Sequence, residues 1–462
     1  MEFVRSEYRK ARFDGFSGFL DEIRITESAA GTVLRIRGWA KIEGSSIKHV
    51  NCYDTQLDAI AGRISTFFER DDLPEGALAF EAEVPVLEGG STCDYEYGML
   101  VEASDGKLYP IYHHSPKNVQ IELDGRCNLR CVICPQAFGV HSGPLSSDDL
   151  NALRPILLQC ECIEINHQGE SLLSPKLAEL LAMIPPHKHI AFNNNGTALK
   201  SKVVRRLLEN APPVRSISIS IDASTESSFF KIRGTSLEKI MENAIAFKEA
   251  RDAAGLHFPQ IMLTCTVMNE FMDEVPGLVA LAAKLDGVFR YWPLVGSGLH
   301  GGEKWVVPFH GTDSKFEYDK QIPRDGDAWD RMAKEVQREA DRLGVNVVDP
   351  FQYSWSKDEK DGSLKPTSSE GISECQLIYR QHFFNANGNA QMCCVQTAPL
   401  FNWREFGPTN FDRHPAVVEA RQDASRGVIP KACSGASCSY VAGKLAPSMS
   451  ERPLTYIERG FI

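Results

Sequence analysis

The chain lacks several features that would assign it to a specialised class of protein. It has a net charge of −11 over 462 residues and no block of consecutive lysines and arginines. Proteins that follow nucleic-acid phosphates need such basic surfaces, so we expect no nucleic-acid partner. The chain also lacks any run of 18 or more apolar residues, and residues 1–16 have no apolar core of the kind found in signal peptides. We therefore expect a cytoplasmic protein with no membrane span.

The first part of the chain has the pattern of short antiparallel strands. In residues 1–115, apolar and polar side chains alternate, β-branched and aromatic residues are frequent, and Gly, Asp and Pro interrupt the runs. This pattern predicts a β-sandwich-like N-terminal domain. The expected strands lie in 19–25, 32–42, 49–55, 77–86, 95–104 and 107–113.

From about residue 116 the pattern changes to strand-like runs that alternate with amphipathic helical stretches. Six such βα units predict a parallel sheet and an α/β fold, a (β/α)6 partial TIM barrel over 116–350. In barrels of this kind the chemistry lies at the C-terminal ends of the strands. A polar stretch at 354–371 has the composition of a linker, and a small cysteine-bearing module is expected at 372–445.

Three cysteines lie close together directly after the first predicted barrel strand. Cys127, Cys131 and Cys134 have the spacing C-x3-C-x2-C. In a reducing compartment, thiols at such spacing are more often metal ligands than disulfide partners. Three thiolates on a 4Fe–4S cluster leave one iron open, whereas four thiolates close a cluster or a structural zinc site. Zinc is the alternative, but the nearest histidine, His141, lies seven residues beyond Cys134.

This cysteine loop resembles that of the radical S-adenosylmethionine (SAM) enzymes, which place the same spacing after the first strand of a (β/α)6 partial barrel. The resemblance implies that the three cysteines hold a 4Fe–4S cluster and that SAM binds the open iron. It also implies a flavodoxin- or ferredoxin-type reductant. Reductive cleavage of SAM would then give a 5′-deoxyadenosyl radical that abstracts hydrogen from the substrate.

Further motifs extend the resemblance over residues 116–295. The segment NHQGESLL is similar to the family's GGEPLL motif, so Gly169 is expected to let the backbone approach SAM and Glu170 to meet its ammonium group. NNNG is similar to the TNG motif, which implies that Asn195 lies near SAM. The chain differs in having Ile133 where the family usually has an aromatic residue. The resemblance assigns the remaining SAM contacts to Ser218, Ser220 and Asp222 at the ribose, Arg233 at the carboxylate and Asn269 near the adenine.

A second group of cysteines follows the predicted linker. The segment 375–393 resembles the opening hairpin of SPASM and twitch modules, which carry auxiliary 4Fe–4S clusters. Its ANGNAQ sequence independently predicts a hairpin with an Asn-Gly turn. One auxiliary cluster needs four ligands, and the expected set is Cys375, Cys393, Cys433 and Cys438, with Cys394 facing the other way. Four residues separate the last pair, unlike in related modules, so ligation by three cysteines and a zinc knuckle stay open as alternatives.

These resemblances also bear on the reaction. Similar enzymes with one auxiliary cluster dehydrogenate a cyclitol alcohol, and the GWA segment at 38–40 resembles a β-domain found on polysaccharide enzymes. We hypothesise oxidation or epimerisation of a carbohydrate or cyclitol-like small molecule. The alternatives are maturation of a ribosomal peptide and a non-catalytic iron–sulfur sensor. Candidates for substrate contact at the strand ends are His167, Cys265, Tyr291 and Trp292.

Overall fold

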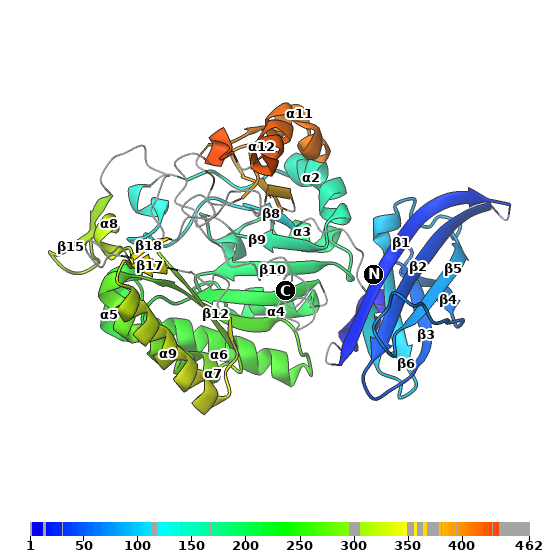
Figure 1. The fold of residues 1–462 in the computed structure, drawn as a ribbon, viewed down its shortest axis with the longest axis horizontal. Coiled ribbons are helices and arrows are strands. Elements are labelled where there is room, and N and C mark those ends of the chain that lie inside the picture. Colours follow the sequence, from blue (N-terminus) through cyan, green and yellow to red (C-terminus); the bar gives the residue numbers. More distant parts are fainter. Residues whose placement is uncertain are drawn as a thin grey trace.

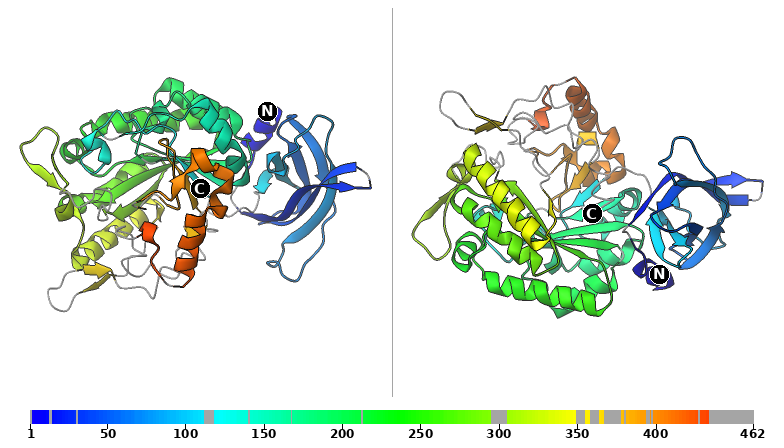
Figure 2. Two further views of the ribbon diagram at one scale, coloured as in Figure 1. Left: turned by 90° about the horizontal axis from the view of Figure 1, so that it is seen from above. Right: turned by 60° about the horizontal axis from the view of Figure 1, so that its bottom comes forward.

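The computed structural model shows a β-rich N-terminal part, drawn in blue, beside a larger α/β part (Figures 1 and 2). In the residues that it describes, no helix is both long and apolar enough to cross a membrane. The described residues are 2–12, 15–29, 31–111, 118–139, 141–166, 168–211, 213–294, 305–348, 355–357, 364–366, 378–379, 381–393, 396, 398–426 and 428–433.

The N-terminal part consists of one helix and two antiparallel sheets. Apolar side chains of both sheets, among them Leu34, Ile36, Val50, Phe80 and Met99, share one buried core. Alternation along each strand produces this arrangement, because every second side chain points to the same face. The elements are α1 (Glu2–Arg9), the sheet of β1 (Phe16–Ser28), β2 (Gly31–Ile42) and β5 (Leu78–Pro85), and the sheet of β4 (Ala59–Ile64), β3 (Ile47–Asp54), β6 (Tyr97–Ala103) and β7 (Leu108–Ile111), with the short 3-10 helix η1 (Asp94–Glu96) before β6.

The second part is built on a large sheet whose strands are mostly parallel, which confirms the α/β class. The parallel strands, in spatial order, are β16 (Val347–Val348), β13 (Val288–Pro293), β12 (Gln260–Val267), β11 (Val214–Ser220), β10 (His189–Asn194), β9 (Cys162–Ile165), β8 (Asn118–Ile121) and β19 (Gln381–Phe384). Two antiparallel strands, β20 (Asn389–Gln391) and β21 (Phe401–Asn402), complete its edge.

Helices cover one face of this sheet with apolar side chains, which form the main core of the molecule. Local sequence sets where they begin and end. The Ser146 hydroxyl and the Asp149 carboxylate cap one helix reciprocally, and Gly234 and Gly344 end two others in the left-handed conformation. The helices are α2 (Ser147–Gln159), α3 (Leu177–Met183), α4 (Ser201–Glu209), α5 (Glu226–Arg233), α6 (Leu237–Ala253), α7 (Val275–Ala283) and α9 (Gly326–Leu343).

The C-terminal segment joins the same sheet. Strand β19 pairs in parallel with β8, and the Glu122 amide donates to the Phe384 carbonyl over 3.0 Å. The hairpin between β19 and β20 turns at Gly388, whose φ is 95°, as the Asn-Gly pair predicts. Helices α11 (Trp403–Phe406) and α12 (Pro415–Ser425) follow.

The remaining described elements are β14 (Val306–Pro308), β15 (Lys315–Glu317), α8 (Tyr318–Gln321), β17 (Trp355–Lys357), β18 (Leu364–Pro366) and the 3-10 helices η2 (Pro135–Phe138), η3 (Ser171–Leu173), η4 (Asn269–Glu274), η7 (Pro408–Arg413) and η8 (Lys431–Cys433).

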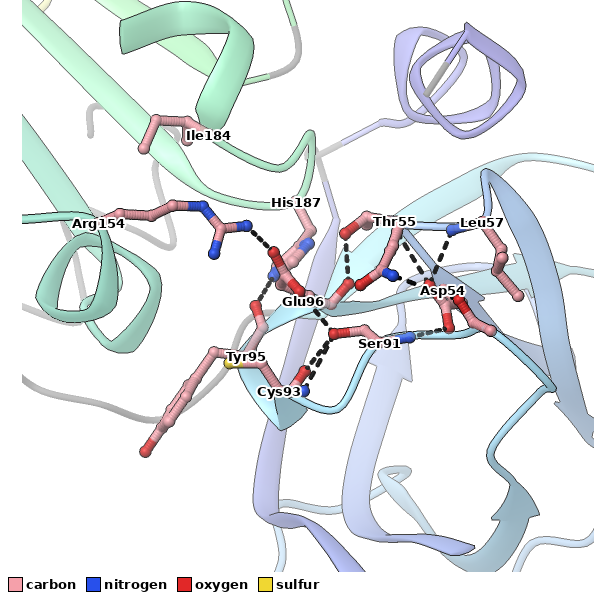
Figure 3. Close-up of polar contacts among 12 residues, drawn as sticks. Asp54, Thr55, Leu57, Ser91, Cys93, Tyr95, Glu96, Arg154, Ile184 and His187 are labelled. Atoms are coloured by element: carbon pink, nitrogen blue, oxygen red, sulfur yellow. Dashed lines mark hydrogen bonds and ion pairs between the residues drawn. The ribbon is translucent and has the colours of Figure 1, made fainter. Parts of the chain in front are cut away.

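The N-terminal part contacts the α/β part at the edge where the parallel strands begin. Arg5 donates to the Ile184 carbonyl over 3.3 Å, just after α3 ends. Figure 3 shows the neighbouring contacts, in which Arg154 of α2 forms an ion pair with Glu96 and His187 lies 2.9 Å from the Tyr95 carbonyl oxygen. The loops at the C-terminal ends of the strands therefore lie at the opposite end of the sheet.

Candidate functional site

The loop that carries the three cysteines follows β8 and is held in place by backbone contacts. The Cys134 amide donates to the Cys131 carbonyl over 3.0 Å, which closes a turn around the last two cysteines. The Val132 amide donates to the Ile232 carbonyl over 2.9 Å, and the Trp305 indole donates to the Val132 carbonyl over 3.0 Å. Segments distant in sequence thus support this loop from two sides.

Donor groups from three different segments lie next to the cysteine sulfurs. The Leu129 amide lies 3.4 Å and the Asn195 side-chain amide 3.6 Å from the Cys127 sulfur, and Arg233 Nη1 lies 3.9 Å from the Cys131 sulfur. Nitrogen donors directed at sulfur stabilise a negatively charged thiolate, as they do around iron–sulfur clusters. The site therefore fits a cluster ligated by these sulfurs.

Burial raises the pKa of all three thiols. It raises the pKa of Cys131 to about 11 and that of Cys134 to about 12. Both thiols are consequently protonated at neutral pH unless a metal displaces the proton. In the part of the chain that the structure describes, no group of three or more His, Cys, Asp or Glu side chains converges to hold a single metal ion.

Gly169 and Glu170 follow β9 and connect the cysteine loop to the next strand. A Cβ atom at Gly169 would lie 1.7 Å from the Asp124 carbonyl oxygen. Glycine therefore allows residue 169 to approach the backbone of the segment before the cysteine loop. The Glu170 carboxylate accepts hydrogen bonds from the Asn195 amide over 2.7 Å and the Leu172 amide over 3.1 Å. Burial raises the pKa of Glu170 to about 7, and a cationic ligand beside it would lower that pKa.

Asn195 follows β10 and connects two of the motifs. Its side-chain amide donates to Asn128 over 3.0 Å in the cysteine loop and also faces the Cys127 sulfur. Gly196 has a φ of 76°, and a Cβ there would lie 2.6 Å from the Ile240 side chain. Glycine at this position therefore allows both the left-handed turn and the packing of α6 that place Asn195.

Asp222 and Arg233 form a buried ion pair beside the cysteine loop. Arg233 Nε and Nη2 lie 2.7 and 2.6 Å from Asp222 Oδ2, while Asp222 Oδ1 accepts from the Thr266 amide over 2.9 Å. Both residues are expected SAM contacts, at the ribose and at the carboxylate. The structure shows them bonded to each other, with Arg233 also facing Cys131.

The other expected SAM contacts lie at the ends of the next strands. Ser218 and Ser220 alternate along β11 on the face opposite Ile217 and Ile219. Asn269 begins η4, directly after β12, and is exposed. The predicted contacts therefore come from the C-terminal ends of successive strands.

Two candidates for substrate contact face the helices instead. Cys265 is paired in register with Tyr291, and the Tyr291 ring packs 5.9 Å from Trp329 of α9. Trp292 points to the other face of the sheet, with the Arg290 guanidinium 5.3 Å from its ring centre. His167 lies outside the described residues.

Two residues that the sequence did not predict, Arg290 and Glu164, lie on the same face as Trp292. The available signal was a charged side chain at an alternate position in an otherwise apolar strand, as in VFRYWP and CIEI. Alternation within a buried strand separates the face that packs against helices from the face that does not.

The second cysteine group is described only in part. Cys393 is half-buried just after β20, and Cys433 is buried at the end of η8. Cys375, Cys394 and Cys438 lie outside the described residues. The expected ligand set of the auxiliary cluster stays a prediction.

Two curated proteins are similar to the chain in sequence, while no protein-family model matches it. The GTP 3′,8-cyclase of Listeria welshimeri is 26% identical over 269 residues, which cover 56% of this chain and 75% of the relative. The GTP 3′,8-cyclase of Limosilactobacillus fermentum is 25% identical over 228 residues, which cover 47% and 66%. These similarities support the resemblance to radical SAM enzymes.

Solved structures with a related arrangement include three systems. Streptococcus suis SuiB bound to precursor peptide SuiA has 15% identity, a TM-score of 0.48 and a coverage of 66% of both chains. anSMEcpe with bound AdoMet and Kp18Cys peptide has 14% identity, a TM-score of 0.48 and a coverage of 67% of this chain and 84% of that one. BtrN with AdoMet and 2-DOIA has 12% identity, a TM-score of 0.32 and a coverage of 67% and 87%. TM-scores below 0.5 are too low to carry an inference about function.

Proposed function

We propose that this protein is a radical SAM enzyme that acts on a carbohydrate or cyclitol-like small molecule. The observation that carries the proposal is the meeting of three sequence motifs at the cysteine sulfurs, where Asn195 faces Cys127 and Arg233 faces Cys131. Cys127, Cys131 and Cys134 would hold the 4Fe–4S cluster. The residues that would hold SAM are Gly169, Glu170, Asn195, Ser218, Ser220, Asp222, Arg233 and Asn269.

The protein's own groups have defined roles in this proposal. The cluster and SAM, when bound, supply a carbon-centred radical after one-electron reduction by a flavodoxin- or ferredoxin-type donor. Glu170, held by the Asn195 backbone amide, presents a carboxylate to the SAM ammonium. The Asn195 side-chain amide and the Arg233 guanidinium stabilise negative charge on the ligating sulfurs. The Thr266 backbone amide and the Arg233 guanidinium fix the Asp222 carboxylate just beyond the end of β11.

The proposed reaction is oxidation or epimerisation of an alcohol carbon. The support is the face of the sheet opposite the main core, because it carries polar side chains suited to hydroxyl groups. The N-terminal part contacts the opposite end of the sheet, so a small substrate at the cysteine loop would be held by the α/β part alone. We also propose an auxiliary 4Fe–4S cluster held by Cys375, Cys393, Cys433 and Cys438.

Anaerobic reconstitution with iron and sulfide counting tests both clusters. With the auxiliary cluster present we expect about eight irons per chain, and with the SAM cluster alone about four. Electron paramagnetic resonance of the reduced protein should show a signal that shifts when SAM is added. Reductive SAM cleavage, measured as 5′-deoxyadenosine, should be lost in Cys127→Ala and kept in Cys93→Ala, a control at a half-buried cysteine of the N-terminal part. Cleavage by Cys127→Ala would refute the proposal.

A further inference from the structure

One face of the parallel sheet packs against the helices of the main core, and the opposite face carries polar and charged side chains. Residues paired in register on neighbouring parallel strands point to the same side. Ile165, Ile219, Leu263 and Phe289 point into the helix-covered core. The side chains at alternate positions therefore point to the opposite face, and they include Gln120, Glu164, Ser218, Ser220, Thr264 and Arg290.

Arg290 is a cation on this face that has no acceptor among the described residues. The half-buried side chain makes no hydrogen bond or ion pair with any residue in the described ranges, and its Nε is covered by protein and has no acceptor there. Its guanidinium is supported by the Trp292 ring, 5.3 Å away. A buried polar group left without a partner costs about 1–3 kcal/mol, so this guanidinium is arranged for an acceptor that a ligand supplies.

Register places Arg290 beside the proposed SAM contacts. Arg290 pairs with Thr264, and Trp292 pairs with Thr266 on the adjacent strand. The Thr266 amide in turn donates to Asp222 Oδ1 over 2.9 Å. A ligand group bound to Arg290 on β13 would therefore be separated from Asp222, which follows β11, by the single strand β12.

A carboxylate lies within electrostatic reach of Arg290 on the same face. Burial raises the pKa of Glu164, while Arg290 and a hydrogen bond from Asn166 act in the opposite direction. No ion pair joins Glu164 to Arg290 in the described residues, so the two charges remain separate groups on this face. Gln120 lies next to Glu164 in register, and Gln381 of β19 donates to it over 2.7 Å. Gln120 is buried and also donates to Asn166, so Glu164 is the acceptor of this row for a ligand hydroxyl.

We propose that the substrate is an anionic sugar or cyclitol whose carboxylate or phosphate binds the Arg290 guanidinium, with Glu164 accepting a hydrogen bond from one of its hydroxyl groups. The inference rests on the proposed function, because it assigns the substrate class of that site. Arginine suits this role since its planar fork matches the oxygens of both anions.

Calorimetric titration of the anaerobic, cluster-reconstituted full chain with SAM tests the inference. The probes are D-glucose, D-glucuronate and D-glucose 6-phosphate, which share a pyranose ring and differ in charge at one end. We expect at least one anionic probe to bind about tenfold more tightly than glucose, a difference of about 1.4 kcal/mol. The stronger of the two anionic probes identifies a carboxylate or a phosphate as the preferred group.

Variants separate anion binding from a structural role. Arg290→Gln should lose the preference for the anionic probe, and Arg290→Lys should keep part of it because lysine retains charge but not the fork. Glu164→Gln should bind the anionic probe more tightly, since it removes a like charge. Arg205→Gln, on the outer surface of α4, is the matched control and should bind as the wild type does. If Arg290→Gln does not fold, Arg290→Lys and Glu164→Gln carry the test.

Equal binding of glucose and the anionic probes would overturn the inference, as would no binding of any probe up to about 10 mM. An anion preference that persists unchanged in Arg290→Gln would do the same. The proposed function fails separately, because it is read from reductive SAM cleavage by the wild type without probes. A wild type that cleaves SAM but does not discriminate among the probes refutes only the anion site. A wild type that binds the anionic probe through Arg290 but does not cleave SAM refutes only the radical SAM proposal.

Discussion

The two ends of the parallel sheet satisfy their buried charges in different ways. Where the strands begin, protein groups meet two of these charges, since Arg154 pairs with Glu96 and Lys188 donates to the Cys160 carbonyl over 3.2 Å. Where the strands end, Arg233 and the Asn195 amide face thiol sulfurs, and Arg290 has no acceptor in the described residues. The first end thus contacts the N-terminal part, while the second carries the proposed ligand site.

The largest expected effect comes from breaking the buried ion pair of Asp222 with Arg233 at the ligand end. Both Asp222 oxygens accept hydrogen bonds, one from Arg233 and the other from the Thr266 amide. In Asp222→Asn the amide nitrogen must face one of these donors, and Arg233 loses its counter-charge. We expect a loss of about 3 kcal/mol in the free energy of unfolding, as for other buried pairs that lose one partner. Urea unfolding measures it.

The exposed carboxylate of Asp313 provides the control for this variant. Asp313→Asn should change stability by less than about 0.5 kcal/mol. SAM binding should weaken in Asp222→Asn and stay unchanged in Asp313→Asn. A loss below about 1 kcal/mol in Asp222→Asn would show that Arg233 finds another partner, and the contrast between the two ends would then disappear.

At the interface end, a pH-dependent effect is expected from Lys188. Burial lowers its pKa to about 8 from an ordinary value of 10.5, against the opposing influence of Cys160, Cys93 and Glu161. The unfolded chain therefore binds more protons than the folded protein between pH 8 and 10.5, and stability contributed by this group rises with pH across that window. Below pH 8 the buried ammonium carries its full desolvation cost.

Lys188→Met removes the titrating ammonium and replaces lysine with an unbranched, apolar side chain of similar length. The stability difference between the variant and the wild type should shift in favour of the wild type by about 2 kcal/mol between pH 8 and pH 10. Thermal or urea unfolding of both proteins at several pH values measures the difference, and groups common to both cancel. A constant difference over this range would mean that Lys188 does not change its charge there.

Sequence patterns predicted the strands and helices well, because most of them bury one face. Each of the six expected N-terminal strand segments overlaps a strand, and α2 begins after Ser146 through the capping box. Strand β4, with the weak pattern AIAGRI, and helix α1 were missed. The pairing of β19 with β8 was also missed, since it joins segments more than 250 residues apart and depends on tertiary packing rather than on local pattern.

The candidate site was predictable where motifs have fixed spacing and less so where it depends on register. The cysteine loop, Glu170, Asn195 and Asp222 could be named because each follows a recognisable strand. Arg290 and Glu164 could not, because only the pairing of β13 with β12 and of β9 with β8 shows which face they occupy. For the same reason Cys265 was a candidate until register placed it against the helices.

The smallest expected effect comes from the ion pair of Arg154 and Glu96 at the interface end. The Arg154 side chain is 41% exposed, so water and salt screen much of its attraction to the carboxylate. Arg154→Ala should therefore lower the free energy of unfolding by less than about 1 kcal/mol, with the loss shrinking at high salt. Reductive SAM cleavage should be unchanged, because the pair lies at the end of the sheet opposite the cysteine loop. A double-mutant cycle with Glu96→Gln isolates the pair, whereas a change in cleavage would show that the two ends are coupled.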